Sequence, residues 1–317
     1  MFFVFFFASI VLQAQIIDDS LSSITKNTFV NERKQLVFSR YFDSASKQLN
    51  IHYKTKDLVF GKPRTLGFIR CLPDDMWKIA KTPFQKKNLK WLGLTAAGTL
   101  ILIPFDQPIT DGVKNFSENI NLKADTKFGV LLKMGKTKII KYPQNINTAL
   151  YQLGEGGTGM LLAGGLWIYG KANSDYRALQ TASDLAETFI VMGVTTQLLK
   201  RSFGRQSPFM ATQAGGAWHA FPSFKDYQEN TSEYDALPSG HLATMMATVT
   251  VLSMNYPEKK WIKPVGYILM GLSGWAMINT DVHWMSDYPL ALALGYLSGR
   301  ISAMRHVKKN QKKGINF

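Results

Sequence analysis

Residues 233–254, EYDALPSGHLATMMATVTVLSM, place a tight polar turn directly in front of an apolar run. Pro238, Ser239, Gly240 and His241 form the turn, and the run that follows has the length and composition of a buried helix. A helix N-terminus presents free backbone N–H groups and the positive end of the helix dipole, so anions bind there. The stretch therefore indicates either simple helix punctuation or half of a phosphate site.

Six apolar segments predict a mainly α fold in the second two-thirds of the chain. Ala, Leu, Met and Gly dominate these segments over β-branched residues, and their length favours helices over strands. We therefore expect a six-helix bundle whose consecutive helices run up and down. The segments are residues 91–104, 156–170, 181–199, 241–254, 262–278 and 288–302.

An up-and-down bundle brings three polar stretches to one end. They are LLKRSFGRQSPF at the end of the third helix, PSGH at the start of the fourth, and TDVHWMSDY before the sixth. These stretches contain Lys200, His241, His283 and Asp287. A histidine alone is more often a packed residue, but two histidines in register with a lysine and an aspartate predict a functional site.

The three stretches resemble, in order and spacing, the signature of the phosphatidic-acid-phosphatase type 2 superfamily. That superfamily also includes bacterial acid phosphatases and vanadium haloperoxidases, and its signature reads K-x6-R-P, then P-S-G-H, then S-R-x5-H-x3-D. Lys200 and Pro208 fit the first part, residues 238–241 match the second in full, and His283 and Asp287 fit the third. The resemblance covers roughly residues 91–302.

The resemblance implies a metal-free phosphatase without a cofactor that hydrolyses a phosphomonoester or a diphosphate, including a lipid phosphate. In that reading His283 attacks phosphorus, Asp287 orients its imidazole, and His241 protonates the leaving oxygen and then activates water. The phosphoryl oxygens are held by Lys200, Ser239 and Gly240.

The chain departs from the signature at two arginines that normally contact the phosphate. Ser207 and Met277 stand in their places, and Asp281 adds a negative charge near the expected anion site. Arg205 and Arg201 are candidates to replace the lost cations, and Arg205 is also a candidate partner of Asp281. Three outcomes are open, in this order: a phosphatase with a rebuilt pocket, an enzyme of narrowed specificity, or a relic that binds but barely turns over.

Two alternatives to a phosphatase follow from the same residues. A vanadium haloperoxidase must hold vanadate tightly, and the two missing arginines argue against it. A non-catalytic envelope protein that binds anions or lipid on the same scaffold is favoured by Ser207, Met277 and Asp281. His241, His283 and Asp287 speak against that second alternative.

The N-terminus predicts export. Residues 1–12 are an uninterrupted apolar run followed by Gln-Ala-Gln, which suits a signal peptide over 1–14 and is short for a membrane span. We expect an irregular extension over 15–90, a phosphatase-like domain over 91–304 and a basic tail over 305–317. Export places the site in the cell envelope, periplasmic or membrane-associated and facing away from the cytoplasm.

Charge and composition limit the partners. The formal net charge of +15 favours an anionic partner such as a phosphorylated substrate or an anionic membrane surface. No nucleic-acid-binding motif is present, so no nucleic acid is expected, and no protein partner is predicted. The single cysteine, Cys71, excludes an intramolecular disulfide and a cysteine-based metal site.

The lengths and charges of the apolar segments bear on whether the helices cross a membrane. Most apolar segments are shorter than the about 20 residues that a span needs, and the third contains Asp184 and Glu187. These features favour an exported bundle that rests on a membrane. His306 follows the last segment and is expected at the surface.

Overall fold

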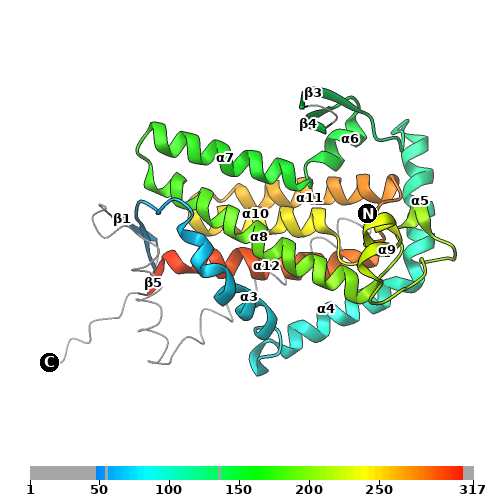
Figure 1. The fold of residues 1–317 in the computed structure, drawn as a ribbon, viewed down its shortest axis with the longest axis horizontal. Coiled ribbons are helices and arrows are strands. Elements are labelled where there is room, and N and C mark those ends of the chain that lie inside the picture. Colours follow the sequence, from blue (N-terminus) through cyan, green and yellow to red (C-terminus); the bar gives the residue numbers. More distant parts are fainter. Residues whose placement is uncertain (1–47, 54–55, 135–136, 310–317) are drawn as a thin grey trace.

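The computed structural model describes residues 48–53, 56–134 and 137–309. It is mainly α-helical, and all six predicted helices are present, which confirms the expected fold class. Figure 1 shows five of these helices lying side by side along the long axis of the molecule, with α4 crossing below them. The six are α4 (Leu89–Leu102), α7 (Gly156–Ala172), α8 (Tyr176–Phe203), α10 (Gly240–Asn255), α11 (Ile262–Asn279) and α12 (Tyr288–Ala303).

Helix α10 lies at the centre of the bundle and packs on α8, α11 and α12. Small residues allow the close approach of α12, because a Cβ atom at Gly299 would lie only 2.8 Å from the carbonyl oxygen of Ala247. The apolar core between these helices is closed by Leu242, Met270 and Met277, all fully or almost fully buried. The central position of α10 explains why it is rich in small and apolar residues and why its threonines bond to its own backbone carbonyl oxygens.

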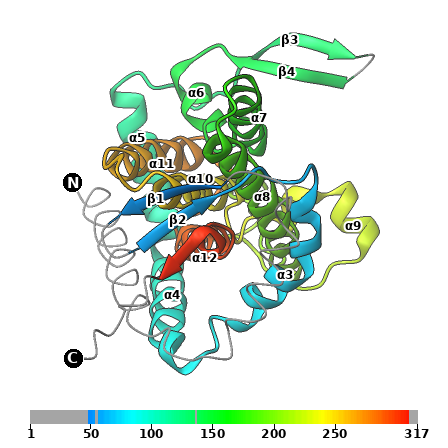
Figure 2. The same ribbon diagram turned by 90° about the vertical axis from the view of Figure 1, so that its left-hand side faces the viewer.

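Shorter elements connect and flank the six helices. Helices α3 (Leu72–Lys81), α5 (Asp106–Asn119), α6 (Ile146–Gln152) and α9 (Phe224–Glu229) were not individually expected from the sequence. Strands β3 (Phe128–Met134) and β4 (Thr137–Pro143) form a hairpin that projects from the bundle in Figure 2. The 3₁₀ turns are η2 (Gly67–Cys71), η3 (Lys86–Asn88), η4 (Ile103–Phe105), η5 (Pro208–Met210), η6 (Thr231–Glu233), η7 (Met285–Asp287) and η8 (Met304–His306).

A small antiparallel sheet joins the two ends of the described chain. It contains β1 (Leu49–Tyr53), β2 (Lys56–Phe60) and β5 (Val307–Lys309), in the order β1-β2-β5. The sheet lies at the left-hand end of the bundle in Figure 1. The part of the predicted N-terminal extension that the structure describes therefore packs on the bundle, and helix α3 contacts α8 and α12.

The charges of the third predicted helix are buried and paired at this same end. Asp184 lies 2.9 Å from Nε2 of His306, and Arg305 pairs with Glu187 and with Asp75 of α3. The expectation that His306 lies at the surface is wrong, since its side chain is fully buried and stacks on Phe60. These ion pairs explain why acidic residues occur in an otherwise apolar helix.

In the described part of the chain, one continuous helical stretch, Lys86–Asn119, is long and apolar enough to cross a membrane. The stretch turns at η4, as Figure 1 shows, so α4 and α5 point in different directions. Each has 14 residues and is about 21 Å long, against a hydrocarbon core of about 30 Å. The predicted signal peptide, residues 1–14, lies outside the described residues.

Candidate active site

Three helix ends meet at the end of the bundle opposite the small sheet. They are the C-terminus of α8, the N-terminus of α10 and the start of α12 with the preceding turn η7. The backbone N–H of Ser239 donates to the carbonyl oxygen of Asp287 at 3.3 Å and links the last two. The rings of His241 and His283 lie edge to face with their centroids 6.1 Å apart. The arrangement expected from an up-and-down bundle is therefore present.

Helix α8 ends at a glycine that turns the chain into the site. Gly204 has φ 58°, and a Cβ atom there would collide with the carbonyl oxygen of His219. A left-handed residue at this place is a common helix ending and favours glycine. The turn directs the next residue, Arg205, into the protein interior, where it is fully buried.

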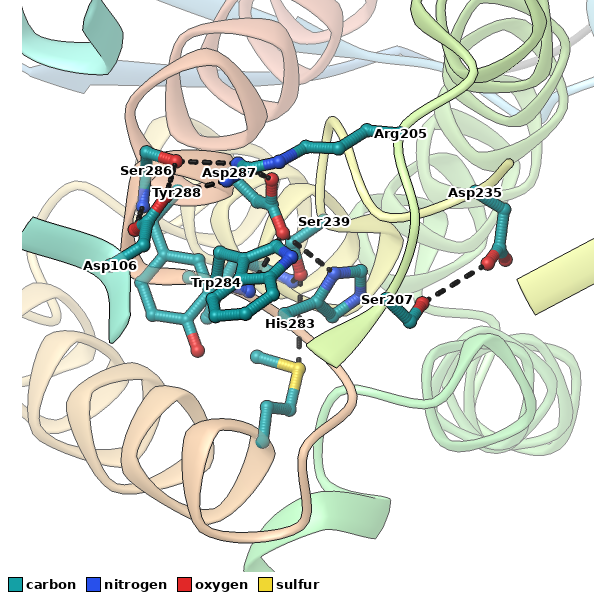
Figure 3. A network of polar contacts seen from close by, with 12 residues as sticks. Asp106, Arg205, Ser207, Asp235, Ser239, His283, Trp284, Ser286, Asp287 and Tyr288 are labelled. Atoms are coloured by element: carbon teal, nitrogen blue, oxygen red, sulfur yellow. Dashed lines mark hydrogen bonds and ion pairs between the residues drawn. The ribbon is translucent and has the colours of Figure 1, made fainter. Parts of the chain in front are cut away.

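Arg205 is an internal structural cation and does not face the pocket. All five of its N–H groups donate to protein oxygens, as Figure 3 shows in part. Its Nη2 lies 2.6 Å from Asp106 and its Nη1 2.8 Å from Asp287. The remaining acceptors are the Ser286 hydroxyl and the Gly215 carbonyl oxygen. The expectation that Arg205 binds phosphate is wrong, because it has no donor left.

Arg201 does not replace the missing arginines either. Its guanidinium donates to the carbonyl oxygen of Pro222 at 3.2 Å and lies over the rings of Phe224 and Tyr227. These contacts hold it against α9 and the loop that precedes it. The expectation that Arg201 serves as a phosphate ligand is therefore not supported by its position.

Asp287 lies fully buried between Arg205 and His283. Its Oδ2 accepts a hydrogen bond from the backbone N–H of Trp284 at 2.8 Å and lies 3.4 Å from Nδ1 of His283. Burial raises the pKa of Asp287, but the Arg205 guanidinium, His283 and the Trp284 N–H outweigh it and hold the pKa below its usual value. The carboxylate is thus ionised and lies beside Nδ1 of His283, which has no hydrogen-bond partner within normal geometry among the described residues. A protonated Nδ1 in this position would face a negative charge, which leaves Nε2 as the nitrogen for chemistry.

The N-terminus of α10 has the geometry of an anion site. The Ser239 side chain is buried, caps the helix by accepting from the Leu242 N–H at 3.5 Å, and contacts the Met277 sulfur at 3.7 Å. A Cβ atom at Gly240 would meet nothing within 4 Å, so the backbone there borders open space. The structure thus gives Ser239 a capping role: its side chain accepts from the Leu242 N–H and its carbonyl oxygen from the Ala243 N–H, so the amides of Gly240 and His241 are the ones left at this helix N-terminus.

His241 stands at this helix mouth in a desolvated position. Its Nε2 is buried and has no hydrogen-bond partner among the residues that the structure describes. Burial, with smaller contributions from His283 and Lys200, lowers the pKa of His241 to about 3. The Tyr151 ring packs against the imidazole with centroids 4.5 Å apart. His241 is therefore a neutral base in the free protein.

Lys200 reaches the same pocket from α8, but an aspartate already pairs with it. Its Nζ lies 3.2 Å from Oδ2 of Asp235, and the Ser207 hydroxyl lies 3.5 Å from Oδ1 of the same carboxylate. Lys200 is almost buried, whereas Asp235 is about a quarter exposed. In the view of Figure 3, Ser207 and Asp235 lie on the opposite side of His283 from Asp287.

The other departures from the signature are also compensated locally. Met277 is fully buried and fills the space beside Ser239. Asp281 pairs with Lys114 of α5 at 2.6 Å, so it does not pair with Arg205 as expected. Lys114 therefore neutralises the acidic residue that precedes His283 in the chain.

Sequence reasoning missed five residues of this arrangement. Three of them are far from the signature in the chain, whereas Asp235 and Ser286 lie beside or within it but match no signature position. Among the described residues, no group of His, Cys, Asp or Glu is arranged to hold a metal ion. The missed residues are Asp106, Lys114, Tyr151, Asp235 and Ser286.

Comparison with known proteins agrees with this geometry. The family model described as the PAP2 superfamily matches residues 181–311. This segment is therefore similar to the PAP2 superfamily. The resemblance read from the signature is thereby confirmed for the part of the chain that contains Lys200, His241, His283 and Asp287.

One curated protein also matches part of this chain. It is the Lipid A 1-phosphatase of Porphyromonas gingivalis, which is 30% identical over 80 residues. The match covers 25% of this chain and 18% of that protein, so it spans less than a fifth of the relative's length. No solved structure matches this chain significantly.

The PAP2 signature and the geometry together define what the pocket can do. It combines a histidine fixed by a buried carboxylate, a second histidine at a helix N-terminus, and a lysine beside them. This combination suits transfer of a phosphoryl group to nitrogen, with proton transfer to and from the leaving oxygen.

Proposed function

We propose that the protein is a phosphatase that hydrolyses a phosphate ester or a diphosphate through a phosphohistidine at His283. The observation that supports it most directly is the contact between Nδ1 of His283 and the buried Asp287, 3.4 Å away. A carboxylate in this position holds the imidazole in the tautomer whose Nε2 lone pair is available. No metal is needed, because Lys200 and the amides at the start of α10 provide the positive potential.

In the first step Nε2 of His283 attacks phosphorus, and the bond between phosphorus and the leaving oxygen breaks. The amides after Ser239 and the ammonium group of Lys200 stabilise the charge on the transferring oxygens. His241 gives a proton to the leaving oxygen. The bound phosphate supplies the negative charge that raises the pKa of His241 from its low value, so the histidine acquires this proton as substrate binds.

In the second step water attacks the phosphohistidine and the bond between phosphorus and nitrogen breaks. His241, neutral after the first step, accepts the proton from water as the new bond forms. Inorganic phosphate leaves, and His283 returns to the tautomer fixed by Asp287. The cycle balances, since one ester and one water give one alcohol and one phosphate.

The outer surface of the bundle supports a lipid substrate and a membrane-associated protein. Large apolar side chains point outward on three helices, and such patches on a soluble monomer usually mark an interaction surface. The relative named Lipid A 1-phosphatase supports the same class of substrate. The residues are Leu94, Leu100 and Ile101 on α4, Met160, Leu161, Trp167 and Ile168 on α7, and Trp261, Val265, Ile268 and Leu272 near or on α11.

The test is release of inorganic phosphate from p-nitrophenyl phosphate and from phosphatidate, with EDTA present. Wild type and His283→Ala are compared, with His219→Ala as a matched control outside the three helix ends. Activity that is lost in His283→Ala and kept in the control supports the proposal. Folded wild-type protein without activity on either substrate contradicts it for these substrates.

A second candidate function is anion or lipid binding without turnover. It is favoured by one observation, the ion pair between Lys200 and Asp235, which occupies the pocket lysine in the free protein. Binding of phosphate without release of product by wild type would support this alternative. A vanadate-dependent oxidation is less favoured, because neutral Met277 and Ser207 stand where cations would hold vanadate.

A further inference from the structure

We propose that Asp235 makes this pocket selective for phosphate compounds that carry a protonated amine close to the phosphoryl group. The inference rests on the proposed function in one respect: it takes from it the place where the phosphoryl group binds. It names a class of substrate, amino-alkyl phosphate esters, that neither the family match nor the matched relative specifies.

The first step of the argument is the position of the Asp235 carboxylate. Its Oδ2 lies 3.2 Å from the ammonium of Lys200 and its Oδ1 3.5 Å from the hydroxyl of Ser207. Its side chain is about a quarter exposed, so solvent or a ligand can reach it. Ser207 is neutral and short and stands where the signature has an arginine, so no cation at this position competes for Asp235.

The second step is the charge around the phosphoryl site. Arg205 pairs with both buried carboxylates, and burial raises the pKa of Asp106 whereas the pKa of Asp287 is held below its usual value. Lys114 is paired with Asp281. Lys200 is paired with Asp235, so a phosphate that binds Lys200 must first break this ion pair.

The third step follows from competition for one lysine. A phosphate that binds Lys200 draws its ammonium away from Asp235 and leaves that carboxylate facing a second anion. Like charges a few ångströms apart in a partly desolvated pocket repel strongly. A ligand that brings its own ammonium group restores the pairing, because Asp235 then accepts from the ligand and Lys200 stays with the phosphate.

The fourth step places the amine on the leaving-group side. Tyr151 packs on His241, the residue that serves the leaving oxygen, at 4.5 Å between ring centroids. Burial raises the pKa of the Tyr151 phenol to about 12, and the charges of Glu155 and Asp235 add to this rise. Two carboxylates thus act on the one phenol beside His241, so negative potential is concentrated where the leaving group lies.

Asp235 has a second possible role that makes a different prediction. A carboxylate that only positions Lys200 would help every phosphate equally, and its removal would weaken all of them. A carboxylate that binds an amine would strengthen the binding of amino compounds only and would weaken the binding of the other phosphate compounds. The two roles are separated by a pair of ligands that differ in charge and not in size.

The experiment is calorimetric titration of the full chain at pH 7 with 2-aminoethylphosphonate and with propylphosphonate. The two have the same number of non-hydrogen atoms, and neither is hydrolysed at its carbon–phosphorus bond by phosphate-ester chemistry, so binding is measured without turnover. The variants are Asp235→Asn, Asp235→Glu and, as a control with the same loss of charge, Asp74→Asn. Asp74 is exposed on α3, at the opposite end of the bundle.

We expect wild type and Asp74→Asn to bind the amino compound about ten-fold more tightly, which corresponds to one charge-assisted hydrogen bond. Asp235→Asn is expected to lose this preference and to bind propylphosphonate more tightly than wild type does. Asp235→Glu is expected to keep the preference. Circular dichroism confirms that each variant is folded.

Equal binding of both compounds to wild type would overturn the inference, as would absence of binding of either. A uniform loss of affinity in Asp235→Asn would show that the residue only positions Lys200. A preference that persists in Asp235→Asn would place the amine elsewhere. The phosphate-release assay is independent: hydrolysis without amine preference leaves the proposed function standing, and amine preference without hydrolysis leaves this inference standing.

Discussion

Nη1 of Arg205 donates to Oδ1 of Asp287 at 2.8 Å, and both side chains are fully buried. The other face of the same carboxylate lies against His283, so the guanidinium acts on the histidine through Asp287. Arg205 also binds Asp106, which in turn accepts from the backbone N–H of Ser286 at 2.9 Å. The network joins α5, the end of α8 and the start of α12, and it contacts His283 through Asp287.

Replacement of Arg205 by methionine should strongly destabilise the fold. The substitution leaves the carboxylates of Asp106 and Asp287 buried without their cation, which typically costs about 3–5 kcal/mol. Urea denaturation followed by circular dichroism measures the change in the free energy of unfolding. Arg201→Met is the control and should lower it by less than about 1 kcal/mol. Equal effects of the two variants would contradict the structural role of Arg205.

Two glycines of the α8 region should respond in opposite directions to alanine. Gly193 lies within the helix with open space around it, so Gly193→Ala should raise the free energy of unfolding by about 0.5–1 kcal/mol. Gly204 has a left-handed backbone and faces His219, so Gly204→Ala should lower it by more than about 1 kcal/mol. Denaturation of the two variants measures both changes. The same sign for both would contradict the turn at Gly204.

Asp287→Asn should reduce kcat and leave KM nearly unchanged. The amide keeps the size of the side chain and one acceptor oxygen, but it removes the negative charge beside Nδ1 of His283 and puts an NH2 donor in place of one oxygen. We expect a loss in kcat on the order of 10²–10⁴-fold. Steady-state phosphate release against substrate concentration separates kcat from KM. A rise in KM with unchanged kcat would mean that Asp287 serves binding and not the nucleophile.

The helical part of the fold could be predicted from the sequence because composition and segment length encode it. All six apolar segments became helices, since Ala, Leu and Met favour helix and each segment is longer than a typical strand. The end of the bundle where the site lies followed from helix direction alone. Helices α3 and α5 are amphipathic, and they were missed because the prediction relied on continuous apolar runs and not on helical periodicity. Helices α6 and α9, with 7 and 6 residues, are too short to give a clear pattern.

The inner part of the site could not be predicted, because its contacts join distant segments. Asp106 follows a short 3₁₀ turn and meets Arg205, 99 positions later, through the path of α4 and α5. Asp235 lies only five residues before Gly240, yet the loop around it is irregular and its partner Lys200 is on another helix. We expected Arg205 at the phosphate site because nothing in the local sequence shows that buried acceptors from distant segments occupy its guanidinium.

The stability of the protein should depend on His241 in mildly acidic solution. Its folded-state pKa of about 3 lies below the ordinary value of 6.5, so below pH 6.5 the unfolded chain binds a proton at this residue that the folded chain does not. The contribution of neutral His241 to the free energy of unfolding is fully present above pH 6.5. It declines by about 1.4 kcal/mol per pH unit as the pH falls toward 3. Urea denaturation of wild type and His241→Asn at pH 7, 6 and 5 tests this.

In that series the stability of His241→Asn should fall less steeply with decreasing pH than that of wild type. His219→Asn, in the loop after η5, is the control for the loss of a histidine other than His241 and His283. Parallel curves for wild type and His241→Asn would contradict the desolvated position of the imidazole.

The most direct test of phosphoryl transfer to His283 is to trap the intermediate. Wild-type protein is mixed with p-nitrophenyl phosphate, quenched rapidly in alkali, in which phosphohistidine is stable, and digested for mass spectrometry. The account predicts one added phosphoryl group on the peptide that contains His283, absent in His283→Ala and retained in His219→Ala. Phosphate release by wild type with no phosphoryl group on His283, or with the group on another residue, would contradict it.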